Sequence, residues 1–475
     1  MMRSRLIVDL DGTLTPSDCA FESLVDVLFH APLAFLCGFI PHILRGRAAF
    51  KIWLAALSSK DWSLLPLNED FLSYLKAQKG EGREIHLVTA TTGAIAEIVA
   101  AQAGVFNGVH GSDGARNLKG KQKLAYIKEY LPGPFAYAAD AHADIPIWRE
   151  ASSIILVHAS GLVETRARRL GVPIEKIFSA PSRFAAWMKA ARLHQWSKNF
   201  LIFVPLFLSH LYQDSEEVSN AILGFLLLSA AASASYLIND LADLDADRKH
   251  RVKHTRPLAK AALPIGQVLI LSTGTVLFSL ALAFWLKPAF GIALGSYILL
   301  TLSYSFFLKK KPLLDAVVLA ALYTLRIVMG VILIDAVFSA WLLTFSMFLF
   351  FSLAMAKRYV ELAQLDKSDL SFVSGRGYQA QDAPLVLALG AATTAGAVLL
   401  FVIYLLNEAV GNAVYDRPAL LWIILIAVAL WLLRIWLLAL RGKLDDDPVA
   451  FAVRDGVSIS LGLASIMAFA IALIS

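Results

Sequence analysis

The chain has 475 residues, of which 58% are hydrophobic and 17% charged, and its mean hydropathy is +0.63. This length predicts more than one domain, and the composition argues against a wholly soluble protein and favours an integral membrane protein. The formal net charge of +6 is modest, and we interpret it as a sign of membrane topology rather than of nucleic-acid binding.

Residues 1–182 mix charged and apolar residues as a soluble domain does. A short strand-like segment ends in Asp9 and Asp11, which alternate along the chain and therefore point the same way. One of these acids can attack phosphorus while the other handles protons. A second predicted strand, residues 84–88, ends in Thr89, and a third, residues 135–139, ends in Asp140. Lys123 lies in a basic run, and Asp144 follows Asp140 by four residues.

The stretch 24–44 is apolar enough to be mistaken for a membrane span. It carries Asp26, His30, Pro32 and Pro41, and a crossing there would leave the rest of the N-terminal domain on the wrong side. We therefore expect a cap helix or a hairpin at the membrane surface.

The order of these motifs, D-x-D-G-T, then Thr, Lys and D-x-x-x-D, resembles the haloacid dehalogenase superfamily over about residues 3–180. The resemblance implies a Rossmann-like α/β core, a helical cap over about residues 16–80, and a site at the carboxyl ends of the strands. It makes Asp9 the nucleophile and Asp11 the general acid/base. The D-x-D-G-T form favours phosphatase chemistry over dehalogenation, and a degenerate domain kept as a scaffold is the alternative.

The resemblance also implies how this domain holds its ligands. Thr89 and Lys123 would bind the phosphoryl oxygens, and Lys119 and Lys121 are alternatives to Lys123. The residues implied to bind Mg²⁺ are Asp9, Asp11, Asp140 and Asp144.

Residues 183–475 consist mostly of long apolar runs. They predict an all-α domain of nine transmembrane helices, at 200–211, 221–238, 264–286, 290–307, 314–334, 337–356, 385–406, 419–440 and 451–473. Lys and Arg gather in alternate connections. The positive-inside rule therefore places the N-terminal domain and the loop after the second span in the cytoplasm, and the last residue outside. We expect the bacterial plasma membrane as the location.

Four carboxylates and one amide follow the second span within residues 239–247, and the basic segment 248–260 comes directly after them. On a helix, Asn239, Asp243 and Asp247 share one face, and Asp240 recurs with the last two at i+3 and i+7. Such oxygen ligands suit Mg²⁺, which takes the rest of its shell from water and substrate phosphates. The alternative is a solvated acidic loop that ends a helix.

Basic residues gather at the cytoplasmic edge of the predicted spans: Lys198, Lys253, Arg256, Lys357 and Arg358. Arg326 lies inside the fifth span, where an ionised group is costly and indicates a functional site. The alternative for Arg326 is a structural pair with a buried carboxylate.

Nine spans with N-D-x-x-D-x-x-x-D after the second resemble the UbiA superfamily of intramembrane prenyltransferases, over about residues 185–475. In that superfamily a second Asp-rich motif normally follows the sixth span. Here that loop opens with Lys357-Arg358, and its carboxylates are Glu361, Asp366 and Asp369. The motif Lys-Arg-Tyr-x-Glu-Leu is similar to the decaprenyl-phosphate phosphoribosyltransferase branch.

The resemblance implies Mg²⁺-dependent transfer of 5-phosphoribose from phosphoribosyl diphosphate to a polyprenyl phosphate. Asp240 and Asp243 would be catalytic, because Mg²⁺ held with Asn239 and Asp247 binds the leaving diphosphate. The basic residues named above, with Arg326 and Glu361, would bind the substrates. The N-terminal phosphatase would then remove the 5-phosphate and yield polyprenylphosphoryl ribose for the cell envelope.

Two other functions stay open. One is UbiA-type prenyl transfer from a polyprenyl diphosphate to an aromatic or other small acceptor, with an independent phosphatase. The other is a protein that only binds or transports lipids. The sequence also leaves open the length of the lipid and whether the chain forms a homo-oligomer.

Overall fold

The computed structural model describes residues 4–113, 116–364, 376–409, 415–444, 448–452 and 454–473. The chain divides into two compact units. The first unit comprises Met1–Ala191 and Tyr236–Thr273, and the second comprises Arg192–Ser235 and Gly274–Ser475. Residues 236–273, which the sequence assigns to the membrane domain, therefore pack with the N-terminal part.

The first unit contains a six-stranded parallel sheet with the order β3-β2-β1-β4-β5-β6. The strands are β1 (Arg5–Val8), β2 (Ile85–Thr92), β3 (Gly108–Ser112), β4 (Phe135–Ala139), β5 (Ser153–Val157) and β6 (Ile174–Phe178). In the register of the sheet, Leu6 of β1 lies opposite Ile85 on one side and Ala136 on the other. The strand order reverses at β1, and in doubly wound sheets ligands bind at the strand carboxyl ends beside such a reversal. This sheet agrees with the predicted Rossmann-like core.

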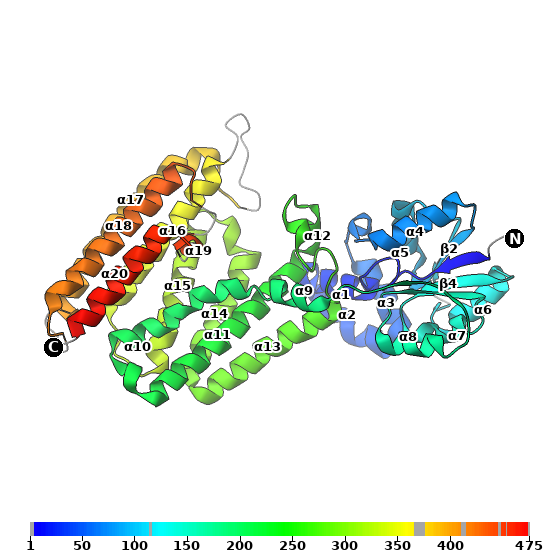
Figure 1. Cartoon of the computed structure of the whole chain (residues 1–475), viewed down its shortest axis with the longest axis horizontal. Helices are drawn as coiled ribbons and strands as arrows, with labels where there is room; N and C mark the ends of the chain where they lie inside the picture. Colours follow the sequence, from blue (N-terminus) through cyan, green and yellow to red (C-terminus); the bar gives the residue numbers. More distant parts are fainter. Residues whose placement is uncertain are drawn as a thin grey trace. The chain divides into compact units, whose positions relative to one another are not determined.

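Helices cover both faces of this sheet (Figure 1). One face packs on α4 (Glu69–Gly80) and α5 (Gly93–Ala103), and the other packs on α6 (Lys121–Tyr130), α7 (Ile145–Trp148) and α8 (Gly161–Arg168). Successive residues of β1 enter opposite layers, so that Leu6 and Val8 are buried on the first face and Ile7 on the second. Burial on both faces explains why β1 reads as a continuous apolar run.

The connection from β1 to β2 forms α1 (Cys19–His30), α2 (Pro32–Leu44), α3 (Arg47–Leu57) and η1 (Trp62–Leu64). The stretch 24–44 is thus two helices that break at Ala31, because Pro32 at the first position of α2 begins a new helix. With 13 residues, α2 is apolar but too short to cross a membrane as a helix. The connection from β1 to β2 is thus helical, and we call it the cap; whether it lies at a membrane surface stays a prediction.

In the part of the chain that the structure describes, eight helices are long and apolar enough to cross a membrane. They are α11 (Ser215–Ala242), α13 (Ile265–Leu286), α14 (Pro288–Phe306), α15 (Leu314–Leu333), α16 (Ala340–Ala363), Ala380–Glu408 with α17 (Ala383–Tyr404), Pro418–Leu440 with α18 (Leu421–Leu440), and α20 (Gly456–Leu473) (Figure 1). The helices α11 and α13 each contribute to both units. The chain is therefore an integral membrane protein, as its composition predicted.

The predicted first span, residues 200–211, is not among these helices, so the count of nine spans is not confirmed. This stretch instead forms the end of a 3₁₀ segment, η3 (Leu193–Phe203), followed by the short α10 (Val204–Leu208). Pro205 is the second residue of α10 and has no N–H to continue the preceding 3₁₀ segment. His210 then adopts a left-handed conformation with φ 59° and ends the segment.

The remaining elements are short. They are η2 (His142–Asp144), α9 (Arg183–Ala190), η4 (Leu211–Gln213), α12 (Leu244–Lys249), η5 (Lys253–Thr255), η6 (Leu308–Lys310), η7 (Ala380–Asp382), η8 (Leu405–Ala409), η9 (Pro418–Leu420) and α19 (Pro448–Ala452).

Candidate functional site

The acids expected at the strand ends lie together at the reversal of the strand order, because Asp9 follows β1 and Asp140 follows β4. We call Asp9, Asp11, Asp140 and Asp144 the Asp9 crevice. Lys123 is buried, with its Nζ 2.8 Å from Oδ1 of Asp9. The same Nζ donates to the hydroxyl of Tyr137 at 3.0 Å, and that hydroxyl donates to Oδ1 of Asp144 at 2.9 Å.

Asp11 connects the crevice to the cap. One carboxylate oxygen accepts the N–H of Cys19, the first residue of α1, at 2.8 Å, and the other accepts the hydroxyl of Thr91 at 2.7 Å. Thr89 lies inside β2, which runs to Thr92 rather than ending at residue 88 as predicted. The buried hydroxyl of Thr89 accepts the N–H of Thr91 at 3.1 Å. The structure therefore adds Thr91 to the groups that orient Asp11.

Asp140 packs tightly against the loop after β1. Gly12 has φ +76°, and a Cβ added there would lie 2.3 Å from Oδ2 of Asp140. Only glycine allows this approach without strain. Burial, reinforced by the nearby Asp9, Asp144 and Asp11 carboxylates, raises the pKa of Asp140 to about 8. Burial and the charge of Asp9 raise the pKa of Asp144 to about 6. Both shifts mean that negative charge is concentrated in the crevice beyond what Lys123 neutralises.

The donor chemistry of the crevice fits a divalent cation. Within the described ranges, no three His, Cys, Asp or Glu side chains already stand at metal-binding spacing. Mg²⁺ does not require such a cage, since it usually binds one or two carboxylates and completes its shell with water and phosphate oxygens. Crowded carboxylates with raised pKa values are the groups that such a cation would stabilise.

The crevice opens into a cavity of about 680 Å³. All four acids and Lys123 line it. Further basic side chains on its wall are Lys51, Lys119, Arg183 and Lys260. Its apolar wall includes Phe21, Ile265 and Ile270. Basic groups around an acidic centre suit a phosphorylated substrate, and Lys121, by contrast, is exposed at the start of α6.

The acids at residues 239–247, which we call the Asp-rich motif, keep the predicted helical register. The helix α11 ends at Ala242, but helical hydrogen bonds continue beyond it. The backbone N–H of Asp243 donates to the carbonyl oxygen of Asn239 at 3.0 Å, and that of Asp247 donates to the carbonyl oxygen of Asp243 at 2.8 Å. The side-chain amide of Asn239 also donates to Asp243 at 3.2 Å. The turn at Asp243 therefore leaves the predicted common face intact.

One guanidinium joins two acids of the motif. Nη1 of Arg256 lies 3.0 Å from Oδ1 of Asp240 and 2.6 Å from Oδ2 of Asp247, and both acids are buried. Burial raises the pKa of Asp247, while the charges of Arg256 and Lys253 act to lower it. These oxygen donors fit Mg²⁺, and Arg256 and Lys253 lie where they could contact an anion bound there.

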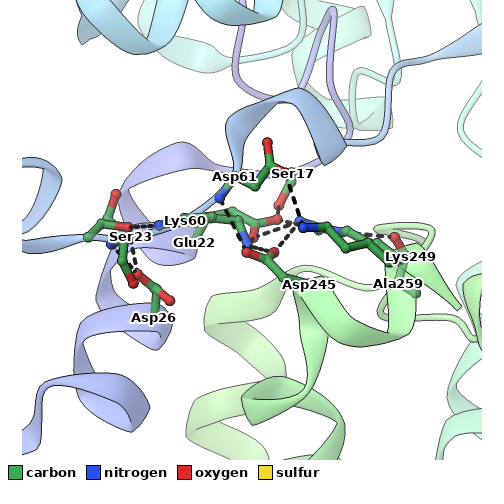
Figure 2. Close-up of polar contacts among 12 residues, drawn as sticks. Ser17, Glu22, Ser23, Asp26, Lys60, Asp61, Asp245, Lys249 and Ala259 are labelled. Atoms are coloured by element: carbon green, nitrogen blue, oxygen red, sulfur yellow. Dashed lines mark hydrogen bonds and ion pairs between the residues drawn. The ribbon is translucent and has the colours of Figure 1, made fainter. Parts of the chain in front are cut away.

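A buried ion-pair network holds the Asp-rich motif against the cap (Figure 2). Glu22 of α1 is completely buried and lies 2.9 Å from Nζ of Lys60 and 2.6 Å from Nη2 of Arg248. Lys60 also pairs with Asp245 of the motif. These basic partners outweigh the cost of burial and lower the pKa of Glu22 to about 2. Sequence reasoning gave no role to Glu22, Lys60 or Arg248.

In the second unit, Arg326 of α15 is buried among neutral groups. Its Nε donates to the side-chain oxygen of Asn199 at 2.9 Å, and its Nη2 donates to the hydroxyl of Tyr297 at 2.9 Å. No carboxylate in the described part of the chain pairs with it, so the structural alternative for Arg326 is not what the structure shows. The guanidinium of Arg326 lies 5.0 Å from the ring centre of Tyr323. The Nζ of Lys198 lies 6.0 Å from the same ring centre.

The motif after the predicted sixth span lies at the end of α16, where it forms a second buried network. Nε of Arg358 lies 3.0 Å from Asp315, and its Nη1 pairs with Glu361. Arg376 approaches the same two acids, at 3.2 and 3.3 Å. Arg358 and Glu361 are thus engaged with protein partners, and Lys357 beside them is partly buried. Asp366 and Asp369 lie outside the described residues.

Comparison with known proteins gives matches over both units. The model of the UbiA prenyltransferase family matches residues 201–462. The uncharacterized protein y4nM of Sinorhizobium fredii is 40% identical over 98% of this chain and 91% of its own length. Nodulation protein NoeC of Azorhizobium caulinodans is 30% identical over 61% of this chain and 94% of its own length.

A third relative has a named enzymatic activity. The decaprenyl-phosphate phosphoribosyltransferase of Mycolicibacterium smegmatis is 32% identical, over 38% of this chain and 58% of its own length. This chain therefore matches somewhat more than half of that enzyme.

Proposed function

The chain belongs to the UbiA prenyltransferase family, and we propose that it transfers 5-phosphoribose from phosphoribosyl diphosphate to a polyprenyl phosphate. The observation that carries this proposal is the pair of cations beside Tyr323, Lys198 and Arg326, of which Arg326 is buried with neutral partners only among the described residues. A buried cation without a carboxylate is costly unless an anion binds to it.

The two transferase reactions differ in the number of phosphate-containing groups that the enzyme must bind. Prenyl transfer to an aromatic acid brings one phosphate-containing group, the diphosphate, besides the carboxylate of the acceptor. Phosphoribosyl transfer brings the diphosphate, the 5-phosphate and the lipid phosphate. The cations beside Tyr323 offer a site for a phosphate in addition to the basic groups around the Asp-rich motif. Glu361 is meanwhile paired with two arginines, which disfavours it as a second metal ligand. The similarity to phosphoribosyltransferases supports the same choice.

The Asp-rich motif would act on the leaving group. Asn239, Asp240, Asp243 and Asp247 would hold Mg²⁺, which supplies positive charge that stabilises the departing diphosphate. Arg256 and Lys253 would bind the same diphosphate. An oxygen of the lipid phosphate forms the new bond to C1 of the ribose while the bond from C1 to the diphosphate breaks. No general base is required, because the lipid phosphate is already ionised near neutral pH.

The N-terminal domain, residues 1–182, would remove the 5-phosphate as a haloacid dehalogenase-like phosphatase. Asp9 attacks the phosphorus and forms an aspartyl phosphate, while Asp11 donates a proton to the departing 5-hydroxyl. Asp11 then takes a proton from the water that releases inorganic phosphate and restores Asp9. Lys123 and Thr89 would stabilise the phosphoryl oxygens, and Asp140 and Asp144 would hold Mg²⁺ together with Asp9 and Asp11.

Fusion of the two activities would raise the effective concentration of the intermediate at the phosphatase. The product would be a polyprenylphosphoryl ribose, a membrane-bound pentose donor for the cell envelope. The distribution of Lys and Arg among the connections supports a cytoplasmic position for the Asp-rich motif, where phosphorylated sugars are available. The ion pair of Lys60 with Asp245 supports the same side for the Asp9 crevice.

The test supplies two substrate pairs to the purified full chain in separate reactions with Mg²⁺. One reaction contains polyprenyl phosphate and phosphoribosyl diphosphate, and the other contains a polyprenyl diphosphate and an aromatic acid. We expect diphosphate release only in the first reaction, and none from an Asp240→Asn variant. Diphosphate release only in the second reaction, with a prenylated acid as product, would show that the alternative is correct.

A further inference from the structure

The helix α2 of the cap exposes an apolar face. Side chains at Leu33, Leu36, Cys37, Ile40 and Leu44 recur every three or four residues and therefore share one side of the helix. The exposed fractions of Leu33, Leu36, Ile40 and Leu44 are 78%, 70%, 63% and 81%. We call these five residues the outer face of α2. No residue of α2 is buried, which is unusual for so apolar a helix and indicates a missing apolar neighbour.

The opposite side of α2 is packed, so the orientation of the outer face is fixed. The ring of His42 stacks on Trp53 of α3 at 4.7 Å, and Phe39 meets Phe50 edge-on at 5.7 Å. A Cβ added at Gly38 would lie 2.2 Å from the Trp53 ring, so the two helices approach closely there. The helices α2 and α3 thus form a built hairpin that presents the outer face away from α3.

The base of this hairpin is held to α1 (Figure 2). Asp26 of α1 accepts the hydroxyl of Ser58 at 2.8 Å and the N–H of Ser59 at 2.9 Å, directly after α3 ends. The next residue, Lys60, pairs with Glu22 of α1 and with Asp245 of the Asp-rich motif. The hairpin is therefore fixed near the point where the candidate span α11 ends.

Apolar contacts also place the start of the hairpin near the end of α11. Val25 and Phe29 of α1 belong to a cluster with Leu237 and Leu241 at the end of α11. The cluster also contains Leu263, Ile265 and Val268, at the start of the candidate span α13. Because α2 follows α1 after a single residue, the hairpin begins close to the ends of two candidate spans.

The charge of the hairpin and the length of α2 indicate that lipid is the apolar neighbour of the outer face. Residues 27–59 contain no Asp or Glu but include Arg45, Arg47 and Lys51, which favours anionic lipid head groups. The 13 residues of α2 extend about 20 Å, short of the roughly 30 Å hydrocarbon core. The helix can therefore lie on a bilayer but cannot cross it.

We propose that the outer face of α2 lies in the interface of the lipid bilayer and anchors the cap there. Lys51 of the same hairpin lines the cavity of the Asp9 crevice. This anchoring would keep the cavity at the level of the lipid head groups. The proposal does not depend on which reaction the crevice catalyses.

The chain supplies its own probe, because Cys37 is exposed on the outer face and Cys19, the other cysteine, is buried. A fluorophore on Cys37 of a Cys19→Ala full-length chain would be studied in nanodiscs of phosphatidylcholine with and without phosphatidylglycerol. Two quenchers would be compared, a nitroxide attached to the lipid and iodide in the water. The matched control carries the label at Glu129→Cys on α6, in a chain with both native cysteines replaced.

We expect the lipid nitroxide to quench the label at Cys37 severalfold more than the label at position 129, and iodide to show the reverse order. Phosphatidylglycerol should strengthen the difference. Equal iodide quenching at both positions would mean that the outer face is open to water, and the proposal would be wrong. Protection of Cys37 from both quenchers would also overturn it, because the face would then be covered by a second copy of the chain or another protein.

Discussion

The Asp9 crevice and the Asp-rich motif both gather carboxylates, but the chain neutralises them differently. In the described part of the chain, Lys123 is the one basic side chain that forms an ion pair with the crevice acids. Burial and the neighbouring carboxylates raise the pKa values of Asp140 and Asp144 to about 8 and about 6. In the motif, Arg256 is shared by Asp240 and Asp247. The described structure therefore gives the four crevice acids one basic partner, whereas in the motif one arginine pairs with two acids.

The largest effects should come from removing one acid of each group. Asp9→Asn should abolish phosphate release and leave phosphoribosyl transfer intact, because the nucleophile is lost and the motif is untouched. Asp240→Asn should abolish transfer and leave hydrolysis of p-nitrophenyl phosphate intact. Assays of both activities on both variants check this pair. Loss of both activities in either variant would show that the two groups of acids do not act separately.

The buried network around Glu22 allows a test of stability. Glu22→Gln should destabilise the first unit by about 3–5 kcal/mol, because Lys60 and Arg248 would lose their buried partner. Asp61→Asn is the matched control, since Asp61 forms an exposed pair with Lys249 at 3.2 Å and solvent-exposed pairs contribute little to stability. Thermal unfolding of the full chain in detergent, followed by fluorescence, measures both. Equal shifts would mean that the network adds little.

The lowered pKa of Glu22 predicts that the stability of the chain depends on pH. The pKa of Glu22 is about 2 in the folded chain, below its ordinary value of 4.5. A lowered pKa contributes stability that is fully present above pH 4.5 and is lost as the pH falls towards 2. The difference in melting temperature between the unmodified chain and Glu22→Gln should therefore shrink as the pH is lowered through this window. A constant difference would contradict the assignment.

Two arginines of the candidate spans, Arg326 and Arg434, provide a comparison of intermediate size. Arg326 has neutral partners, whereas Arg434 of α18 pairs with Asp455 at 2.5 Å. Arg326→Lys should lower kcat/KM for phosphoribosyl transfer about 10- to 100-fold, because a lysine cannot reproduce the fork of a guanidinium around a phosphate. Arg434→Lys should alter stability more than transfer. Similar transfer rates in the two variants would remove Arg326 from the substrate site.

The smallest effect concerns the metal. If Mg²⁺ must displace Arg256 at the motif but meets unneutralised acids in the crevice, hydrolysis should reach half of its maximum at a lower Mg²⁺ concentration than transfer does. Titration of both activities in one preparation measures the order. The reverse order would contradict the difference between the two groups of acids.

Local sequence patterns predict much of the fold and of the two groups of acids. Asp9 and Asp140 directly follow short apolar strands, and parallel strands bring such positions to one edge. The Asp-rich motif kept its face because its register is that of a helix. Eight spans could be found because each is a long apolar run. Residues 200–211 could not be assigned in this way, since composition does not reveal that a new helix starts at Val204, with Pro205 in its first turn.

Other features depend on contacts that no local pattern encodes. Glu22 and Arg248 are 226 positions apart in the sequence, and nothing in either segment points to the other. Tyr137 lies within a buried strand like its apolar neighbours, yet its hydroxyl joins Lys123 to Asp144. The motif Lys357-Arg358 drew attention to the end of α16, but its sequence could not show that Asp315 and Glu361 pair with Arg358.

The most direct test of the account is the mass of the lipid formed from polyprenyl phosphate and phosphoribosyl diphosphate. The purified Asp9→Asn chain, supplied with Mg²⁺, should yield the phosphoribosyl lipid. The unmodified chain should yield a lipid lighter by one phosphate group. Recovery of unchanged polyprenyl phosphate from both chains, under conditions in which either chain prenylates an aromatic acid, would contradict the account.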